Sequence, residues 1–147
     1  MNFKSHHITK KSYGIILFYF DLKSQKNKFL LVCRKDSLEY VQLIRGNYSK
    51  SNHEKLQSMF NLMTIDEINN LKTLSFQQLW EKLWMKTIKQ DNYRIDYKKN
   101  YENALNKFNK IKESGLLTKF INNYSGCWTE PEWGLPKGRK NYEESNI

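Results

Sequence analysis

Hydrophobic residues follow two patterns along this chain of 147 residues, and the change comes near residue 47. Before it, dense runs of aromatic and branched residues, too short for typical helices, predict strands at 12–20 and 28–34. The polar segment 21–27 predicts a turn that joins them into a hairpin, in which the first strand is buried. The run at 39–44 predicts a third short strand.

Beyond residue 47 the apolar residues recur three and four positions apart, which predicts helices. Three pairs of residues have the spacing of a capping box, in which two side chains satisfy backbone donors at the start of a helix. These pairs are Ser51 with Glu54, Thr64 with Glu67, and Ser75 with Gln78. A longer helix from residue 91 or 92 is predicted to end at Gly115, and 116–121 to form one further helical turn.

Aromatic residues at helical spacing in this region allow two interpretations. They are Trp80, Trp84, Tyr101 and Phe108. Exposed rings can stack on nucleic-acid bases, but the spacing is also what a helix needs to build a core, and we favour the core. The lysines predicted on the opposite face are more typical of a solvated surface than of a nucleic-acid site. They are Lys82, Lys86, Lys89, Lys98 and Lys99.

The segment 126–147 contains both prolines and a spacing that is compatible with phosphate chemistry. Residues 133–139 predict a strand that runs into a glycine-bearing loop. Gly138 is followed, after five residues, by Glu144, which with Glu143 is predicted to open a helix. Carboxylates on one helical turn beside free backbone groups can hold Mg²⁺ or Mn²⁺ against a pyrophosphate. A glycine and a glutamate at this spacing also occur often by chance.

The chain is strongly basic. Lysine and arginine number 25 against 15 aspartate and glutamate residues, so the net charge is +10. A basic chain suits a polyanionic partner such as nucleic acid, a phosphorylated small molecule or an anionic membrane. The abundance of lysine, asparagine and isoleucine is also what an AT-rich genome produces without selection for binding. Charge alone therefore favours a polyanion without identifying one.

Two cysteines, Cys33 and Cys127, lack the spacing of a disulfide framework or a zinc site, which is typical of a reducing compartment. No apolar run approaches the roughly 18 residues of a membrane helix, and the first residues lack the apolar segment of a signal peptide. We therefore expect no membrane partner, and a location in the host cytoplasm or in a virion.

Several short segments together resemble a known family. Trp133-Gly134-Leu135-Pro136-Lys137-Gly138 is similar to the stretch that leads into the Nudix box, which begins with glycine, five residues and glutamate. Three upstream segments, 13–17, 29–32 and 34–37, and a fourth at 45–48 have the order expected of the same enzymes. From residue 12 onward the chain resembles the mRNA-decapping Nudix hydrolases of large DNA viruses, the poxvirus, African swine fever virus and giant-virus type.

This resemblance implies an α+β chain with an incomplete Nudix fold, an α/β/α sandwich interrupted by a helical insertion. It divides the chain into N-terminal strands at 1–46, a helical insertion with RNA-binding potential at 47–125, and a strand with the start of the Nudix box at 126–147. The implied reaction cleaves the m7G cap to m7GDP and 5′-monophosphate RNA. Some members of the family hydrolyse diphosphoinositol polyphosphates or nucleotides instead, so the substrate stays open.

The resemblance also implies roles for individual residues. Glu144 matches the first glutamate of the box, which orients other box residues, and Gly138 can offer its backbone carbonyl to the Mg²⁺ or Mn²⁺ that the family uses. Four cations are implied to meet substrate phosphates, and these are Lys137, Arg139, Arg34 and Lys35. Trp128 and Trp133 are weaker candidates for stacking on the methylated guanine, since such tryptophans are more often core residues. Glu132 is interpreted as a surface charge.

The chain departs from the family pattern after Glu144, because the Arg-Glu-x-x-Glu-Glu part of the box, which supplies the main metal ligands, is not in this sequence. We therefore expect the polypeptide alone to bind no metal, to lack decapping activity, and to fold poorly because its strands lack partners. A second polypeptide that completes the box is one possibility. The alternatives are a catalytically dead, basic RNA-binding module and a helical protein with a chance Gly-x5-Glu ending.

Overall fold

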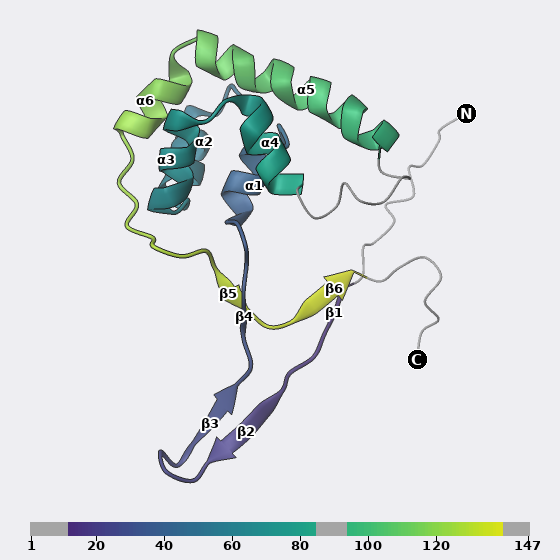
Figure 1. Ribbon diagram of the computed structural model, residues 1–147. Coiled ribbons are helices and arrows are strands. Elements are labelled where there is room, and N and C mark those ends of the chain that lie inside the picture. Colours follow the sequence, from purple (N-terminus) through teal and green to yellow (C-terminus); the bar gives the residue numbers. More distant parts are fainter. Residues whose placement is uncertain (1–11, 85–93, 140–147) are drawn as a thin grey trace, which may run out of the picture. The chain divides into compact units, whose positions relative to one another are not determined.

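The computed structural model describes residues 12–84 and 94–139, with only the backbone for 94–99 and Arg139 (Figure 1). Within these residues the chain is a mixed α+β protein, which confirms the predicted class. It divides into two compact units. The first contains the residues up to Cys33 and those from Trp133 onward, and the second runs from Arg34 to Glu132. The division into 1–46, 47–125 and 126–147 stays a prediction.

Antiparallel pairs of short strands make up the described part of the first unit. The pairs are β1 (Ser12–Gly14) with β6 (Lys137–Arg139), β2 (Phe18–Asp21) with β3 (Lys26–Phe29), and β4 (Val32–Cys33) with β5 (Trp133–Gly134). The pairing of β2 with β3 confirms the predicted hairpin. The Lys28 ammonium lies 2.7 Å from the Asp21 carboxylate across it, and this contact, with a hydrogen bond from Ser24, lowers the pKa of Asp21.

The predicted burial of 12–20 is wrong. The segment is divided into β1 and β2, and its apolar side chains are exposed, with 72% of Ile15 and 58% of Phe18 accessible to solvent. The strands of this unit are paired edge to edge, and no described side chain of the unit is buried. An apolar sequence gives a buried strand only where a second layer covers its face.

Helices form the second unit, and among the described residues they number six. They are α1 (Leu38–Ile44), α2 (His53–Asn61), α3 (Ile65–Thr73), α4 (Phe76–Trp84), α5 (Arg94–Glu113) and α6 (Leu116–Asn122). Gly115, with a φ of 73°, adopts the left-handed conformation between α5 and α6. This confirms the helix end predicted there and the short helix predicted after it.

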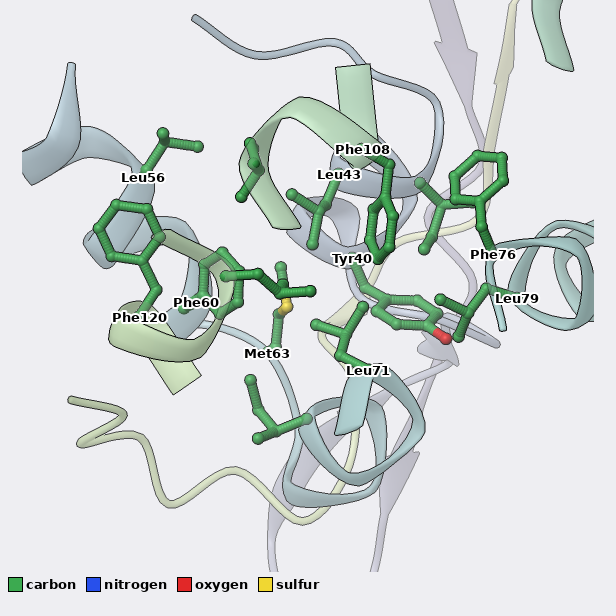
Figure 2. Packing of buried hydrophobic residues seen from close by; sticks show 14 of the residues in the cluster. Tyr40, Leu43, Leu56, Phe60, Met63, Leu71, Phe76, Leu79, Phe108 and Phe120 are labelled. Atoms are coloured by element: carbon green, nitrogen blue, oxygen red, sulfur yellow. The ribbon is translucent and has the colours of Figure 1, made fainter. Parts of the chain in front are cut away.

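One core holds these helices together. Figure 2 shows side chains from different helices pointing toward one another, with Phe60 and Phe120 at one end and Tyr40, Phe76 and Leu79 at the other. The aromatic residues expected in the core are in it, since Trp80 and Phe108 are buried, and Trp84 and Tyr101 pack against them. The interpretation of this stripe as core is therefore confirmed.

The predicted strand at 39–44 is wrong, because these residues form helix α1. Tyr40, Leu43 and Ile44 are all buried on one face at helical spacing. The Ser37 hydroxyl caps the helix by accepting a hydrogen bond from the Tyr40 amide at 3.2 Å. Aromatic and branched residues favour strands, but packing against the neighbouring helices outweighs that preference here.

The capping boxes give a mixed result. The box at Thr64 and Glu67 is confirmed in both of its hydrogen bonds. The Ser75 amide donates to the Gln78 side chain at 2.9 Å, and the Gln78 amide to the Ser75 hydroxyl at 3.3 Å, which confirms the box before α4. The box predicted at Ser51 is wrong, because Asn52, one residue later, caps α2 by accepting from the Lys55 amide.

Glu67 joins two helix starts. The residue is 5% exposed, and its carboxylate accepts from the Ser37 amide at 2.6 Å, the Ser37 hydroxyl at 2.7 Å and the Thr64 amide at 2.8 Å. Ser37 and Thr64 are the caps of α1 and α3. Backbone donors at both helix starts are thus satisfied by one buried carboxylate.

Candidate nucleic-acid interface

The residues predicted to meet a pyrophosphate in the C-terminal segment lie on strand β6. Lys137 and Gly138 pair with Gly14 and Tyr13 of β1, so Gly138 is part of a strand and not of the predicted loop. A side chain added at Gly138 would meet no described atom within 4 Å. Arg139 is described only in its backbone, and Glu144 lies outside the described residues.

The family resemblance also implies a site for Mg²⁺ or Mn²⁺. Mg²⁺ and Mn²⁺ prefer several oxygen ligands, mainly carboxylates. Among the side chains that the structure describes, those of residues 12–84 and 100–138, no group of three or more histidine, cysteine, aspartate or glutamate residues is placed to hold a metal ion. The described residues therefore do not fit the metal that the family resemblance implies.

Arg34 and Lys35, also predicted to meet phosphates, lie at the start of the second unit and contact other protein groups. The Arg34 guanidinium is 3.9 Å from the Glu132 carboxylate. The backbone amide of Arg34 donates to the Glu132 carbonyl at 3.1 Å. Lys35 donates to the Lys82 carbonyl at 2.8 Å. Glu132 also accepts from the amide of Leu38, the first residue of α1, so it is more than the surface charge that the sequence indicated.

The two tryptophans considered for cap stacking lie in different units. Trp128, in the second unit, forms an isolated bridge with Thr64 and is 51% exposed. Trp133, in the first unit, pairs with Cys33 and is 54% exposed. Both rings have accessible surface for a planar ligand, and stacking on a cap stays a prediction for each.

A cavity in the helical unit gathers polar and cationic groups that the sequence did not connect. Its volume is about 410 Å³, within the range of small-molecule sites. Residues after α1, at the end of α4 and along α5 form its walls. They are Arg45, Gly46, Asn47, Trp80, Trp84, Asn100, Asn103 and Lys107. We call this space the Arg45–Lys107 cavity. No carboxylate is among the described residues that line it.

Gly46 brings the loop after α1 against α5. Its φ of 70° is in the left-handed region that favours glycine. A side chain at Gly46 would lie 3.3 Å from the Ala104 Cα and 3.2 Å from the Lys107 Cδ, so the close approach also favours glycine. The Lys107 ammonium donates to the Gly46 carbonyl at 2.7 Å. These contacts hold Lys107 at the edge of the cavity.

Arg45 is held by an aromatic ring. Its guanidinium carbon lies 4.6 Å from the centre of the Trp84 ring, a distance typical of a cation–π contact. Trp84 packs in turn on Trp80, with ring centres 5.7 Å apart. Because Trp80 is 1% exposed, it serves as core behind the cavity wall. The cavity thus presents a cation backed by a packed tryptophan pair.

Further lysines extend the positive charge from this cavity. Lys50 lies near Lys107 and Lys110, and Lys107 and Lys110 are three residues apart on α5. Partial burial lowers the pKa of Lys50, and the charges of Lys110 and Lys107 lower it further, while Glu113 opposes them. Arg45, Lys50, Lys107 and Lys110 form what we call the basic ridge.

Sequence reasoning missed the Arg45–Lys107 cavity because its two cations are far apart along the chain. One signal was present, since segment 45–48 was among those that carried the family resemblance. The glycine within it marks a close backbone approach, but a sequence does not say which helix is approached. The lysine at 107 is one of many on the predicted helices.

Comparison with known proteins finds viral relatives whose names contain the words mRNA-decapping protein. No protein-family model matches the chain. The chain is 34% identical over 140 residues to the mRNA-decapping protein g5R of a Kenyan pig isolate of African swine fever virus, covering 94% of this chain and 54% of that protein. The g5R protein of a Namibian warthog isolate is 32% identical over 139 residues, with the same coverage of each.

A more distant relative comes from Acanthamoeba polyphaga mimivirus. Its name contains the words mRNA-decapping protein, and it is 26% identical over 131 residues, covering 76% of this chain and 36% of the relative. The chain spans about half the length of the African swine fever virus proteins it matches. The predicted resemblance to the mRNA-decapping proteins of large DNA viruses is therefore confirmed along nearly the whole chain.

Proposed function

We propose that this chain is the RNA-holding part of an mRNA-decapping enzyme that acts in the host cytoplasm. The observation that carries this proposal is the match of 94% of the chain to proteins named mRNA-decapping proteins. The net charge of +10 and the basic ridge support RNA as the partner, because phosphate contacts dominate the affinity of proteins for nucleic acids. The proposed reaction converts the m7G cap to m7GDP and leaves a 5′-monophosphate RNA.

In this proposal the strand pairs of the first unit belong to a Nudix-type catalytic domain, and the helices of the second unit hold the RNA. The catalytic carboxylates and the Mg²⁺ or Mn²⁺ they bind belong to residues outside the described set, because the described residues do not fit a metal. We expect a protein consisting of these 147 residues alone to leave the cap intact, because the Arg-Glu-x-x-Glu-Glu segment is not among them.

Release of m7GDP from cap-labelled RNA tests this proposal. The purified 147-residue protein is assayed with Mg²⁺ or Mn²⁺, alone and together with a polypeptide corresponding to the part of the African swine fever virus relative that it does not match. We expect no release by the chain alone and metal-dependent release by the mixture. Release by the chain alone would show that it holds a complete catalytic site. No release by any mixture that binds RNA would remove the decapping proposal.

A second function, a basic RNA-binding module without catalysis, is favoured by the Arg45–Lys107 cavity, which is lined by cations and amides and by no described carboxylate. Filter binding of uncapped RNA is expected for both functions, and release of m7GDP separates them. In both, affinity falls with added salt, by a log–log slope of about 0.7 for each phosphate contact of a single strand. In the binding module no combination of polypeptides and metal releases m7GDP.

A further inference from the structure

We propose that the Arg45–Lys107 cavity binds one nucleotide of a single-stranded RNA, with Arg45 and Lys107 on its phosphate and the asparagine amides on its base. The inference rests on the proposed function in taking RNA as the ligand, and it deepens that function by naming the place of contact. It applies equally to a decapping enzyme and to a binding module.

The lining of the cavity matches the parts of a nucleotide. A phosphate requires cations, and the described lining has two cationic side chains and no carboxylate. A base edge requires donors and acceptors together, and each asparagine amide supplies both. Three asparagines line the cavity, and they are Asn47, Asn100 and Asn103. A volume of about 410 Å³ has room for one such unit.

Both cations are positioned before any ligand arrives. The ring of Trp84 lies under the Arg45 guanidinium, and the Gly46 carbonyl accepts from Lys107. A hydrogen bond to a carbonyl leaves other ammonium donors of Lys107 for a phosphate oxygen. Side chains that are already ordered lose less conformational entropy when they bind a ligand. The two cations also share one cavity, in which both can reach the same ligand.

The cavity continues into the basic ridge. Lys107 and Lys110 are three residues apart on α5, and the charges of both, together with that of Glu113, act on Lys50. A free mononucleotide uses only the cavity, whereas the next phosphates of an RNA strand also meet these lysines. The geometry therefore favours a strand over a free nucleotide, and the favoured contacts are to phosphates, sugars and one base.

Replacing Asn103 by aspartate tests the cavity with almost no change in side-chain shape. Asn103 is exposed on α5, and Asn103→Asp places a negative charge in the lining that also holds the two cations. Binding of the whole chain to a labelled oligouridylate of about ten nucleotides is measured by fluorescence anisotropy. We expect Asn103→Asp to weaken binding about tenfold or more, the cost of a lost charge-assisted contact with added repulsion.

Asn69→Asp is the matched control, because it adds the same charge at an exposed position of α3 that does not line the cavity. We expect it to weaken binding about twofold or less, through long-range charge alone. Arg45→Gln should lower the log–log salt slope by about 0.7, the loss of one phosphate contact. Thermal melting and circular dichroism of each variant confirm that the helices are intact.

Equal weakening by Asn103→Asp and Asn69→Asp, with the helices intact, would overturn the cavity as the site and leave RNA binding in place. Competition by adenosine monophosphate at concentrations similar to those of the oligonucleotide would overturn the strand as the ligand. Absence of RNA binding by the unaltered chain would remove the RNA-holding role itself. The binding readout uses uncapped RNA, so failure of cap cleavage does not affect it.

Discussion

The two units of this molecule bury their apolar residues to very different extents. Every buried hydrophobic side chain among the described residues belongs to the second unit, and most of the large exposed ones belong to the first. The first unit is richer in apolar runs, yet Ile15, Phe18 and Leu30 face solvent. Hydrophobic composition therefore does not make a core. The helices of the second unit cover one another, whereas the strands are paired only along their edges.

The largest difference is expected when the units are separated. A polypeptide of residues 34–132 keeps the whole described core and should be monomeric with a cooperative melt. The 147-residue chain should self-associate and bind a hydrophobic dye, because exposed apolar strands recruit other surfaces. Analytical ultracentrifugation and dye fluorescence measure both. The opposite result, in which the whole chain is monomeric and binds no dye while the 34–132 polypeptide aggregates, would mean that the first unit stabilises the second.

One phenylalanine from each unit tests the same difference at single residues. Phe60 is fully buried and Phe20 is 51% exposed. Phe60→Ala should lower the free energy of unfolding by about 3–5 kcal/mol, the typical cost of a buried aromatic truncation. Phe20→Ala should change it by about 0.5 kcal/mol or less. Urea melts followed by circular dichroism at a helix wavelength report both values, and equal losses would mean that β2 is buried in solution.

Two capping residues of the second unit, one buried and one exposed, test whether burial sets the loss of unfolding free energy when a capping side chain is removed. Glu67→Ala leaves three donors of Ser37 and Thr64 without their acceptor in a buried site, and should cost about 2–4 kcal/mol. Gln78→Ala removes the equivalent side chain from the exposed box before α4, and should cost about 0.5–1.5 kcal/mol. The same urea melts apply. A smaller loss for Glu67→Ala than for Gln78→Ala would contradict the role of Glu67 as a shared cap.

Predictions from the sequence were right where the interactions are local and wrong where they connect distant parts of the chain. Local signals worked where they were self-contained, as at the capping box of Thr64 and Glu67 and the helix end at Gly115. Residues 39–44 failed, because a strand preference was outweighed by packing against helices far away in the sequence. Burial of 12–20 failed because burial depends on what covers a strand, which composition does not specify.

The cavity in the helical unit was missed for the same reason. The phosphate-binding residues expected around Gly138 came from a resemblance to a family, and their role stays a prediction. The Arg45–Lys107 cavity depends on a contact between Gly46 and Ala104, which no local pattern reveals. The motif containing Gly46 was noticed, but its partner helix could be identified only from the structure.

The smallest expected effect concerns tyrosines and alkaline pH. Burial raises the pKa of Tyr48 to about 12, whereas an unfolded tyrosine titrates near 10. Stability from Tyr48 is therefore complete below pH about 10 and is lost as the pH rises toward 12, because the unfolded chain ionises first. Tyr48→Phe should reduce the fall in melting temperature between pH 9 and pH 11, approximate limits set by those pKa values.

Burial also raises the pKa of Tyr40, so part of the alkaline fall in melting temperature should remain in Tyr48→Phe. The Tyr48 hydroxyl has no hydrogen-bond partner among the described residues, so the substitution should not destabilise the protein at neutral pH. Tyr19→Phe in the first unit, where the ring is 60% exposed, is the matched control and should leave the alkaline fall unchanged. An equal response of both variants would place Tyr48 in solvent and remove this part of the contrast between the units.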